Sequence, residues 1–171
     1  MPKFIILEGM DSTGKSTLSK YIADRLDAMY FHSSGHRTLH LVMQAHHQQI
    51  LDCAEVNLNH GHNFVLDRHW PTQHAYATVL RPHIANLYDI DRLRNQAHAL
   101  GATYIYCYDV DYVRYCETHK NHDKFNFHHL SAMEYYQIHL EYEYIFKDVP
   151  HIRYKIEEEG KDLEKFTQQF L

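Results

Sequence analysis

The chain has 171 residues, of which 44% are hydrophobic and 23% charged, and its formal net charge is −5 with the histidines neutral. This length and composition predict a single globular domain over residues 1–171, large enough to bury a core. The net negative charge argues against a nucleic acid such as duplex DNA as the main partner. No apolar run approaches the ~20 residues of a membrane span, so we expect no membrane association.

Strand and helix patterns alternate along the chain. Apolar runs such as Phe4–Leu7 indicate buried strands, and apolar residues spaced like Leu18 and Ile22 indicate helices. Arg81 and Pro82 are expected to break a helix. In chain order, the patterns predict a strand over 3–8, a helix over 15–28, a strand over 29–32, a helix over 38–59, a strand over 63–67, helices over 71–80 and 85–100, a strand over 102–108, helices over 110–118 and 130–146, a strand over 151–156 and a helix over 161–170.

This alternation predicts an α/β fold, in which a five-stranded parallel sheet is flanked by helices on both faces. On such sheets, ligands bind beside the carboxyl ends of the strands. The loop from Gly9 to Ser16, the segment from Asp67 and the segment after Tyr108 all leave such ends. We therefore expect these three segments to form one crevice.

The segment from Gly9 to Ser16 matches the phosphate-loop motif G-x-x-x-x-G-K-[ST] without a gap. It lies between the first strand and the first helix, as in the P-loop NTPase fold. There, backbone N–H groups surround the phosphates of a nucleotide, Lys15 reaches the β- and γ-phosphates, and Ser16 can ligate Mg²⁺. The residues expected to bind ATP are Gly9, Asp11, Ser12, Thr13, Gly14, Lys15, Ser16 and Thr17.

A second polar segment begins with Asp67 and Arg68, at the end of a short apolar strand. If this strand neighbours the loop strand, Asp67 can hold Mg²⁺ with Ser16 or act on the attacking oxygen. Arg68 supplies a permanently charged, planar donor for a second phosphate. An Asp that caps a helix and an Arg with a structural role form the alternative.

Other P-loop classes fit less well. A GTPase should carry an N-K-x-D motif, but residues 120–123 read K-N-H-D. A chain of 171 residues leaves little room for the extra modules of a motor ATPase. These observations favour a small kinase.

Residues 7–17 resemble the phosphate loop of thymidylate kinases, whose pattern is roughly F-E-G-x-D-x-x-G-K-[ST]-T. Residues 67–69, which read D-R-H, are similar to that family's D-R-[YH] motif. The likeness is clear over 3–28 and 63–80 and weaker elsewhere. Related deoxynucleoside kinases usually carry E-R-S at the second motif, so D-R-H favours a monophosphate acceptor.

The resemblance implies transfer of the ATP γ-phosphate to a (deoxy)nucleoside monophosphate, with a dTMP-like acceptor. By that likeness, Asp11 lies near the acceptor sugar and Arg68 binds the acceptor phosphate. Thr72 and Gln73 occupy positions near the base. Tyr76 lies beside the acceptor pocket, although a core role for this tyrosine is equally compatible with the pattern.

Two departures from the family pattern concern cations. The loop has no arginine, and members of this kind usually carry arginines in a mobile lid, which we expect over residues 114–129 with Arg114 as a catalytic cation and Lys124 as an acceptor contact. The family's E-P-G motif is replaced by residues 33–35, and Arg37 is expected to reach the acceptor instead. The short chain is similar to compact kinases of bacterial viruses.

Two other functions are retained as alternatives: a kinase acting on a hydroxyl of a nucleoside or of a modified DNA base, and a nucleotide-binding regulatory protein without turnover. The expected partners are small nucleotides, with a homodimer as a further expectation, for which the helix around 39–58 has enough apolar positions. The three cysteines lack metal spacing, which predicts reduced thiols and a cytoplasmic protein, in the host cytoplasm if the chain is viral. The 17 histidines are expected mostly at the surface.

Overall fold

The computed structural model describes residues 1–33, 40–85, 89–109, 111–119, 130–156, 158 and 162–170, without the side chains of residues 40–42 and 84. Arg37 and Lys124 lie outside these ranges, as does the predicted lid from residue 120 onward. Within the described residues, no helix is both long and apolar enough to cross a bilayer.

Five parallel strands form one sheet in the order β2-β3-β1-β4-β5. The strands are β1 (Phe4–Gly9), β2 (Met29–His32), β3 (Phe64–Asp67), β4 (Ala102–Cys107) and β5 (His151–Tyr154). All six residues of the central strand β1 are buried, because helices cover both faces of the sheet. This burial explains the continuous apolar runs in the sequence, and the architecture confirms the predicted fold class.

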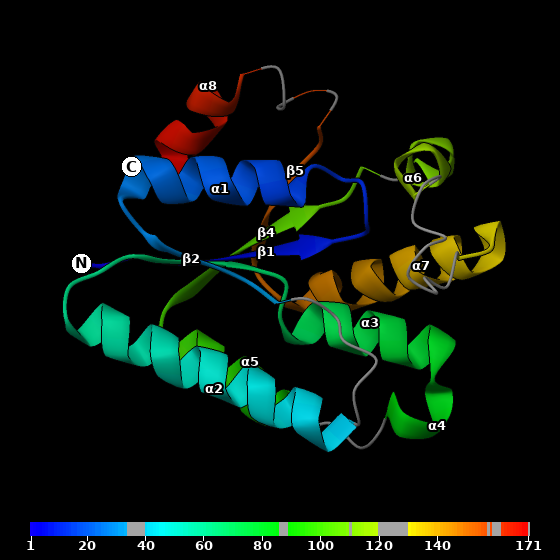
Figure 1. The fold of residues 1–171 in the computed structure, drawn as a ribbon, viewed down its shortest axis with the longest axis horizontal. Helices are drawn as coiled ribbons and strands as arrows, with labels where there is room; N and C mark the ends of the chain where they lie inside the picture. The colour runs from blue at the N-terminus through cyan, green and yellow to red at the C-terminus, as the bar shows by residue number, and fades with distance from the viewer. Residues whose placement is uncertain are drawn as a thin grey trace.

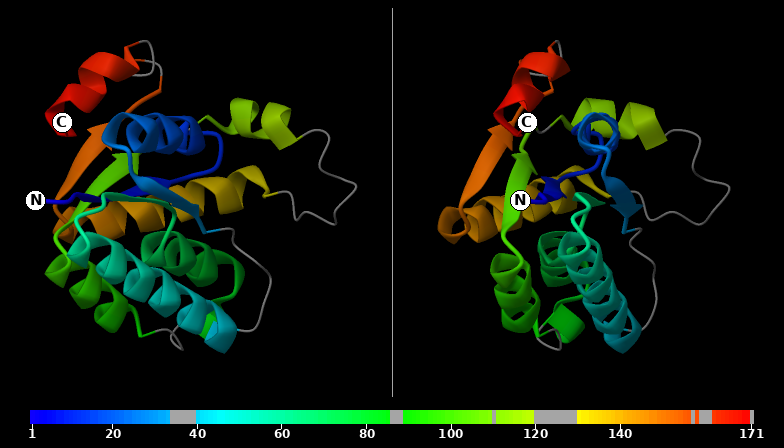
Figure 2. Two further views of the ribbon diagram at one scale, coloured as in Figure 1. Left: turned by 60° about the vertical axis from the view of Figure 1, so that its left-hand side comes forward. Right: turned by 90° about the vertical axis from the view of Figure 1, so that its left-hand side faces the viewer.

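Helices cover both faces of the sheet (Figures 1 and 2). α1 and α8 lie on one face, and α2, α3, α5 and α7 lie on the other. Along β1, Ile5 and Leu7 belong to the cluster beneath α1 and α8, whereas Phe4 and Ile6 belong to the cluster on the opposite face, as strand alternation requires. The helices are α1 (Lys15–Leu26), α2 (His40–Asn59), α3 (Trp70–Leu80), α4 (Pro82–Ala85), α5 (Ile90–Ala99), α6 (Tyr112–His119), α7 (Ala132–Asp148) and α8 (Leu163–Thr167), and a 3₁₀ turn follows over Gln168–Phe170.

The structure differs from the predicted helices around Pro82 and Ile90. Pro82 ends α3 as expected, but it also starts the short helix α4, since a proline is tolerated in a first helical turn. The next helix was predicted from residue 85 and instead begins at Ile90, because the Asp89 side chain accepts a hydrogen bond from the Arg92 backbone N–H and caps it.

The sheet order decides which segments meet. β1 pairs with β3, so that Leu7 lies opposite Asp67, and it pairs with β4, so that Gly9 lies opposite Cys107. Gly9 has φ +135°, and a Cβ there would lie 2.1 Å from the Cys107 carbonyl oxygen. Only glycine therefore lets the chain leave β1 this close to β4 and enter the phosphate loop.

Candidate active site

The loop between β1 and α1 is closed by its own hydrogen bonds. Thr13 Oγ1 donates to the Met10 carbonyl at 2.8 Å, and Lys15 Nζ donates to the same carbonyl. Burial lowers the pKa of Lys15 to about 8. The Lys15 ammonium is held over the loop by the neutral Met10 carbonyl oxygen. A phosphate oxygen can replace this carbonyl, because a charged acceptor forms a stronger hydrogen bond.

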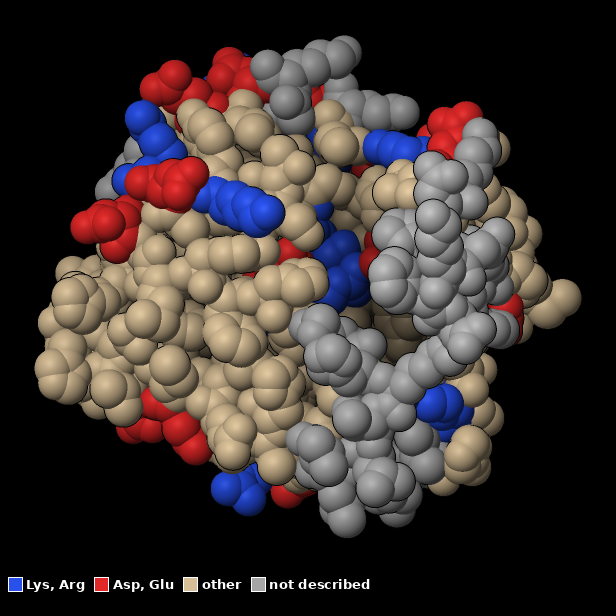
Figure 3. Space-filling model, viewed as in Figure 1, with Lys and Arg blue, Asp and Glu red and all other residues tan. Residues whose placement is uncertain are grey.

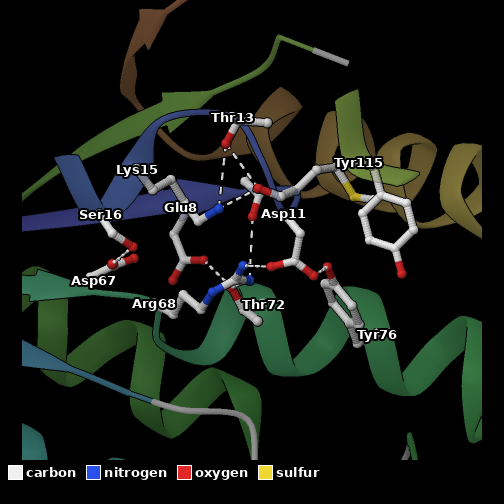
Figure 4. A network of polar contacts seen from close by, with 12 residues as sticks. Glu8, Asp11, Thr13, Lys15, Ser16, Asp67, Arg68, Thr72, Tyr76 and Tyr115 are labelled. Atoms are coloured by element: carbon white, nitrogen blue, oxygen red, sulfur yellow. Dashed lines mark hydrogen bonds and ion pairs between the residues drawn. The ribbon is translucent and has the colours of Figure 1, made fainter. Parts of the chain in front are cut away.

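Ser16 and Asp67 meet as the sequence predicts. Ser16 Oγ donates to Asp67 Oδ2 at 2.7 Å, across the gap between α1 and β3 (Figure 4). His32 Nδ1 also contacts this oxygen at 2.9 Å, and the Tyr30 hydroxyl lies 3.4 Å from it. Asp67 Oδ1 is buried and has no hydrogen-bond partner among the described residues.

These oxygens suit Mg²⁺, which prefers carboxylate, hydroxyl and water ligands. Burial alone would raise the pKa of Asp67, but the His32 hydrogen bond and the charges of Lys15 and Arg68 outweigh it and lower this pKa well below its usual value. Asp67 is therefore ionised at neutral pH, as a metal ligand must be. The unpartnered Oδ1 is consistent with a metal-bound state of the site.

Arg68 follows directly and has an unusual backbone. Its φ is +74°, in the left-handed region that a non-glycine residue occupies at a cost of order 1–3 kcal/mol. Its N–H donates to the Leu7 carbonyl at 3.0 Å. Its guanidinium turns toward the loop, donating to Asp11 Oδ1 and lying 3.4 Å from the Gly9 carbonyl oxygen.

Glu8, to which no sequence motif assigns a role, holds the segment that presents Arg68. Its buried carboxylate accepts the His69 N–H at 2.5 Å and the Thr72 hydroxyl at 2.6 Å. Burial raises its pKa to about 7 against the opposing effect of these hydrogen bonds. A charged residue inside an otherwise apolar strand was the signal that could have identified it.

Asp11 joins the loop to α3. One carboxylate oxygen receives Arg68, and the other accepts the Tyr76 hydroxyl at 2.9 Å. Burial alone would raise the pKa of Asp11, but Arg68 and Lys15 outweigh it and lower this pKa. Figure 4 shows Asp11, Arg68, Thr72 and Tyr76 side by side, so the loop and α3 present one polar surface.

The remaining α3 candidates lie next to this surface. Thr72 Oγ1 is 2.7 Å from the Tyr142 hydroxyl of α7, a contact that no local sequence pattern indicates. Gln73 is buried, and its Nε2 has no partner among the described residues. It is thus an available donor in the first turn of α3.

Other predicted residues differ in their surroundings. Arg114 on α6 forms ion pairs with two acids, Asp109 at 3.0 Å and Asp111 at 3.6 Å. Ser12 has φ +64°, and its hydroxyl is buried without a partner among the described residues. Thr17 is exposed on the first turn of α1.

Not all histidines lie at the surface. His47 and His69 are buried, with their rings 4.9 Å apart, and His69 Nε2 lies 3.1 Å from the His47 carbonyl oxygen. Burial lowers their pKa values to about 2 and about 4, respectively. Both rings are therefore neutral at pH 7 and pack behind the Asp67–Arg68 turn as core residues.

The charged groups of the site are concentrated at the carboxyl ends of β1 and β3. Three carboxylates (Glu8, Asp11 and Asp67) lie close to two cations (Lys15 and Arg68). Figure 3, which has the same view as Figure 1, shows basic and acidic side chains together in a hollow near the centre of the drawn face. Lys15 follows the phosphate loop and Arg68 follows β3, so the two cations belong to different segments. Separate donor and acceptor phosphates would require such an arrangement.

No protein-family model matches this chain, and no curated protein matches it. Several solved structures match it over nearly its whole length. The YorR protein from Bacillus subtilis, in complex with phosphorylated GDP, has a TM-score of 0.68 at 14% identity, covering 98% of this chain and 93% of that one. Deoxyadenosine kinase from M. mycoides has a TM-score of 0.61 at 16% identity with bound dATP, covering 98% of both chains, and 0.60 at 17% identity with bound dCTP, covering 97% of both.

At these identities the likeness shows the fold. The chain has the P-loop kinase fold, with five parallel strands and the phosphate loop after β1. Fold alone does not assign an acceptor, so the acceptor has to be argued from the site.

Proposed function

We propose that this protein transfers the γ-phosphate of ATP to a (deoxy)nucleoside 5′-monophosphate with a dTMP-like base, giving the diphosphate. The position of Arg68 is the observation that carries the proposal. Its partly buried guanidinium lies between the Gly9 carbonyl and Asp11, one residue after Asp67. A permanent cation held there, apart from Lys15, suits the phosphate of an acceptor.

Each residue has a definite part in this proposal. Lys15 leaves the Met10 carbonyl and binds the β- and γ-phosphates. Ser16 and Asp67 would hold Mg²⁺, whose charge would offset that of the phosphates. Arg68 binds the acceptor phosphate and Asp11 accepts a hydrogen bond from the acceptor sugar. An acceptor oxygen attacks the γ-phosphorus, the bond to the β–γ bridging oxygen breaks, and ADP leaves with that oxygen.

An acceptor screen tests the proposal directly. ADP release is measured with deoxynucleoside monophosphates, ribonucleoside monophosphates and nucleosides, each with ATP and Mg²⁺. We expect turnover with at least one monophosphate. Lack of product with every monophosphate, from folded protein that binds ATP, would overturn the proposal.

The Arg68→Lys variant tests the role of the Arg68 guanidinium, on which the proposal rests. Lysine keeps the charge but loses the planar fork, so the acceptor KM should rise about 10- to 100-fold while ATP affinity changes little. Arg94→Lys is the matched control, because Arg94 pairs with Asp91 on the exposed side of α5. An unchanged acceptor KM in Arg68→Lys would remove Arg68 from the acceptor site.

A kinase acting on a hydroxyl is the second candidate. The unpartnered Asp67 Oδ1 favours it, because a free carboxylate oxygen can accept the proton of an attacking hydroxyl. The low pKa of Asp67 makes it a weak base and counts against this role. Turnover with nucleosides or with hydroxylated DNA bases, but not with monophosphates, would establish it. ATP binding without any product would instead indicate the regulatory alternative.

A further inference from the structure

The carboxyl end of β2 brings a histidine next to the proposed metal ligands. His32 lies in register with Asp67 on the neighbouring strand β3, so the two side chains leave the same face of the sheet. His32 Nδ1 lies 2.9 Å from Asp67 Oδ2, and the same oxygen accepts the Ser16 hydroxyl at 2.7 Å. One carboxylate oxygen thus contacts both a ring nitrogen and a hydroxyl.

The spacing of these three atoms suits ligands that share one cation. Ligand atoms that surround an ion at about 2.1 Å and at right angles lie about 3 Å apart. The observed distances of 2.9 Å and 2.7 Å are close to this value. Protons link the groups in the structure, and a cation can take the place of these protons.

The Asp67 carboxylate has a further oxygen to offer. Its side chain is 0% exposed, and Oδ1 has no hydrogen-bond partner among the described residues. The His32 side chain, in contrast, is 42% exposed, so its ring is accessible to solvent. A buried oxygen without a partner beside an accessible nitrogen indicates an incomplete ligand set, because buried polar atoms are normally paired.

We propose that His32 is a direct ligand of the cation that accompanies the nucleotide, and that this site therefore prefers a divalent transition-metal ion such as Co²⁺ to Mg²⁺. The inference rests on the proposed binding of a nucleotide at the phosphate loop. Transition metals favour imidazole nitrogen, whereas Mg²⁺ prefers oxygen ligands. His32 adds such a nitrogen to the two oxygen ligands that the sequence predicts, Ser16 and Asp67.

The nucleotide would have to supply part of the ligand set. The described residues contain no group of three or more His, Cys, Asp or Glu side chains that could hold a metal ion. His32 and Asp67 therefore need the Ser16 hydroxyl, phosphate oxygens and water to complete the shell. Binding through Nδ1 also requires the ring proton on Nε2, a tautomer that the accessible ring can adopt.

An asparagine at position 32 separates a ligand from a positioning residue. With Mg²⁺, His32 would keep its hydrogen bond to Asp67, and an asparagine amide can donate a similar bond. With Co²⁺, the amide cannot replace the imidazole nitrogen as a ligand. His32→Asn should therefore keep most of the affinity for ATP with Mg²⁺ and lose the preference for Co²⁺.

Isothermal titration calorimetry with ATP, in saturating Co²⁺ or saturating Mg²⁺, measures this preference. We expect the wild type to bind ATP about 10-fold more tightly with Co²⁺, and His32→Asn to bind it about equally with both ions. His98→Asn is the matched control, because His98 is exposed on α5, and it should keep the wild-type ratio. Equal affinities in the wild type, or an unchanged ratio in His32→Asn, would overturn the proposal. Thermal unfolding without metal shows that each variant is folded.

Proton NMR of the complex with Co²⁺ and ATP tests the direct bond. A histidine bound to Co²⁺ gives strongly shifted ring-proton signals, which should be present in the wild type and in His98→Asn and absent in His32→Asn. A wild type that binds Co²⁺ and ATP without these signals would overturn the proposal.

Neither measurement needs an acceptor or turnover, so the two proposals can fail separately. Shifted signals without turnover in the acceptor screen would overturn the proposed phosphate transfer alone. Turnover without shifted signals would overturn the His32 ligand alone.

Discussion

At the scale of single residues, Glu8 links the sheet to the site. Both its oxygens accept hydrogen bonds from the segment after Arg68, through the His69 N–H and the Thr72 hydroxyl. These bonds hold Arg68 in its left-handed conformation, directed at Asp11. The cost of burying this carboxylate is thus balanced by fixing the guanidinium that is proposed to bind the acceptor phosphate.

Glu8→Gln should change the pH dependence of stability. Burial raises the Glu8 pKa from 4.5 to about 7, so the folded protein keeps a proton that the unfolded chain releases. Wild-type stability should therefore fall as the pH rises through this interval. The amide does not titrate, so the free energy of unfolding of the variant relative to the wild type should increase by about 3 kcal/mol between pH 4.5 and pH 7.5.

Urea unfolding at the two pH values measures this change. Glu164→Gln is the control, because Glu164 lies in an exposed ion pair with Arg25. If the free energy of unfolding of Glu8→Gln differs from that of the wild type by the same amount at both pH values, Glu8 titrates normally.

His32 is expected to position Asp67. Its Nδ1 contacts Asp67 Oδ2 at 2.9 Å, which leaves Oδ1 available. His32→Ala should raise the Mg²⁺ concentration needed for half-maximal activity about 10-fold, as the loss of such supporting contacts does at other metal sites. His32→Asn places an amide donor near the same point and should restore most of the affinity. Equal Mg²⁺ requirements in the wild type and His32→Ala would contradict this role.

At the scale of elements, α7 begins with a capping box. Ser131 Oγ accepts the Glu134 N–H at 3.2 Å, and the Glu134 carboxylate accepts the Ser131 N–H at 2.8 Å. Ser131→Ala should lower the free energy of unfolding by about 1 kcal/mol, whereas Ser131→Thr, which keeps the hydroxyl, should keep most of the stability. Equilibrium urea unfolding checks both, and equal losses in the two variants would argue against the cap.

Elements with a strong local signal were predicted well. β1, the phosphate loop and α1 follow from an apolar run, glycines with defined spacing and a helical repeat. The start of α5 was predicted too early, because the Asp89 cap depends on one side-chain hydrogen bond that periodicity does not report. The last helix was predicted as one element, but α8 gives way to a 3₁₀ turn at Gln168.

At the scale of the whole molecule, nucleotide binding should stabilise the fold. A ligand at 100 times its Kd adds about 2.7 kcal/mol to the free energy of unfolding, which raises the Tm of a chain of this size by several degrees. ATP with Mg²⁺ should show this effect in thermal unfolding. Lys15→Ala should abolish it, because Lys15 is the proposed contact of the loop to the β- and γ-phosphates. A Tm increase that persists in Lys15→Ala would indicate another site for ATP.

The sequence alone determined the α/β class, the phosphate loop and the candidate pair Asp67 and Arg68, because each depends on residues close together in the chain. The tertiary structure decided which distant groups meet. The β1–β3 pairing brings Ser16 to Asp67, Glu8 to His69, and Arg68 to Asp11. Local patterns could not report these contacts, since hydrogen bonds between neighbouring strands and helices depend on the sheet order, which sequence periodicity leaves open.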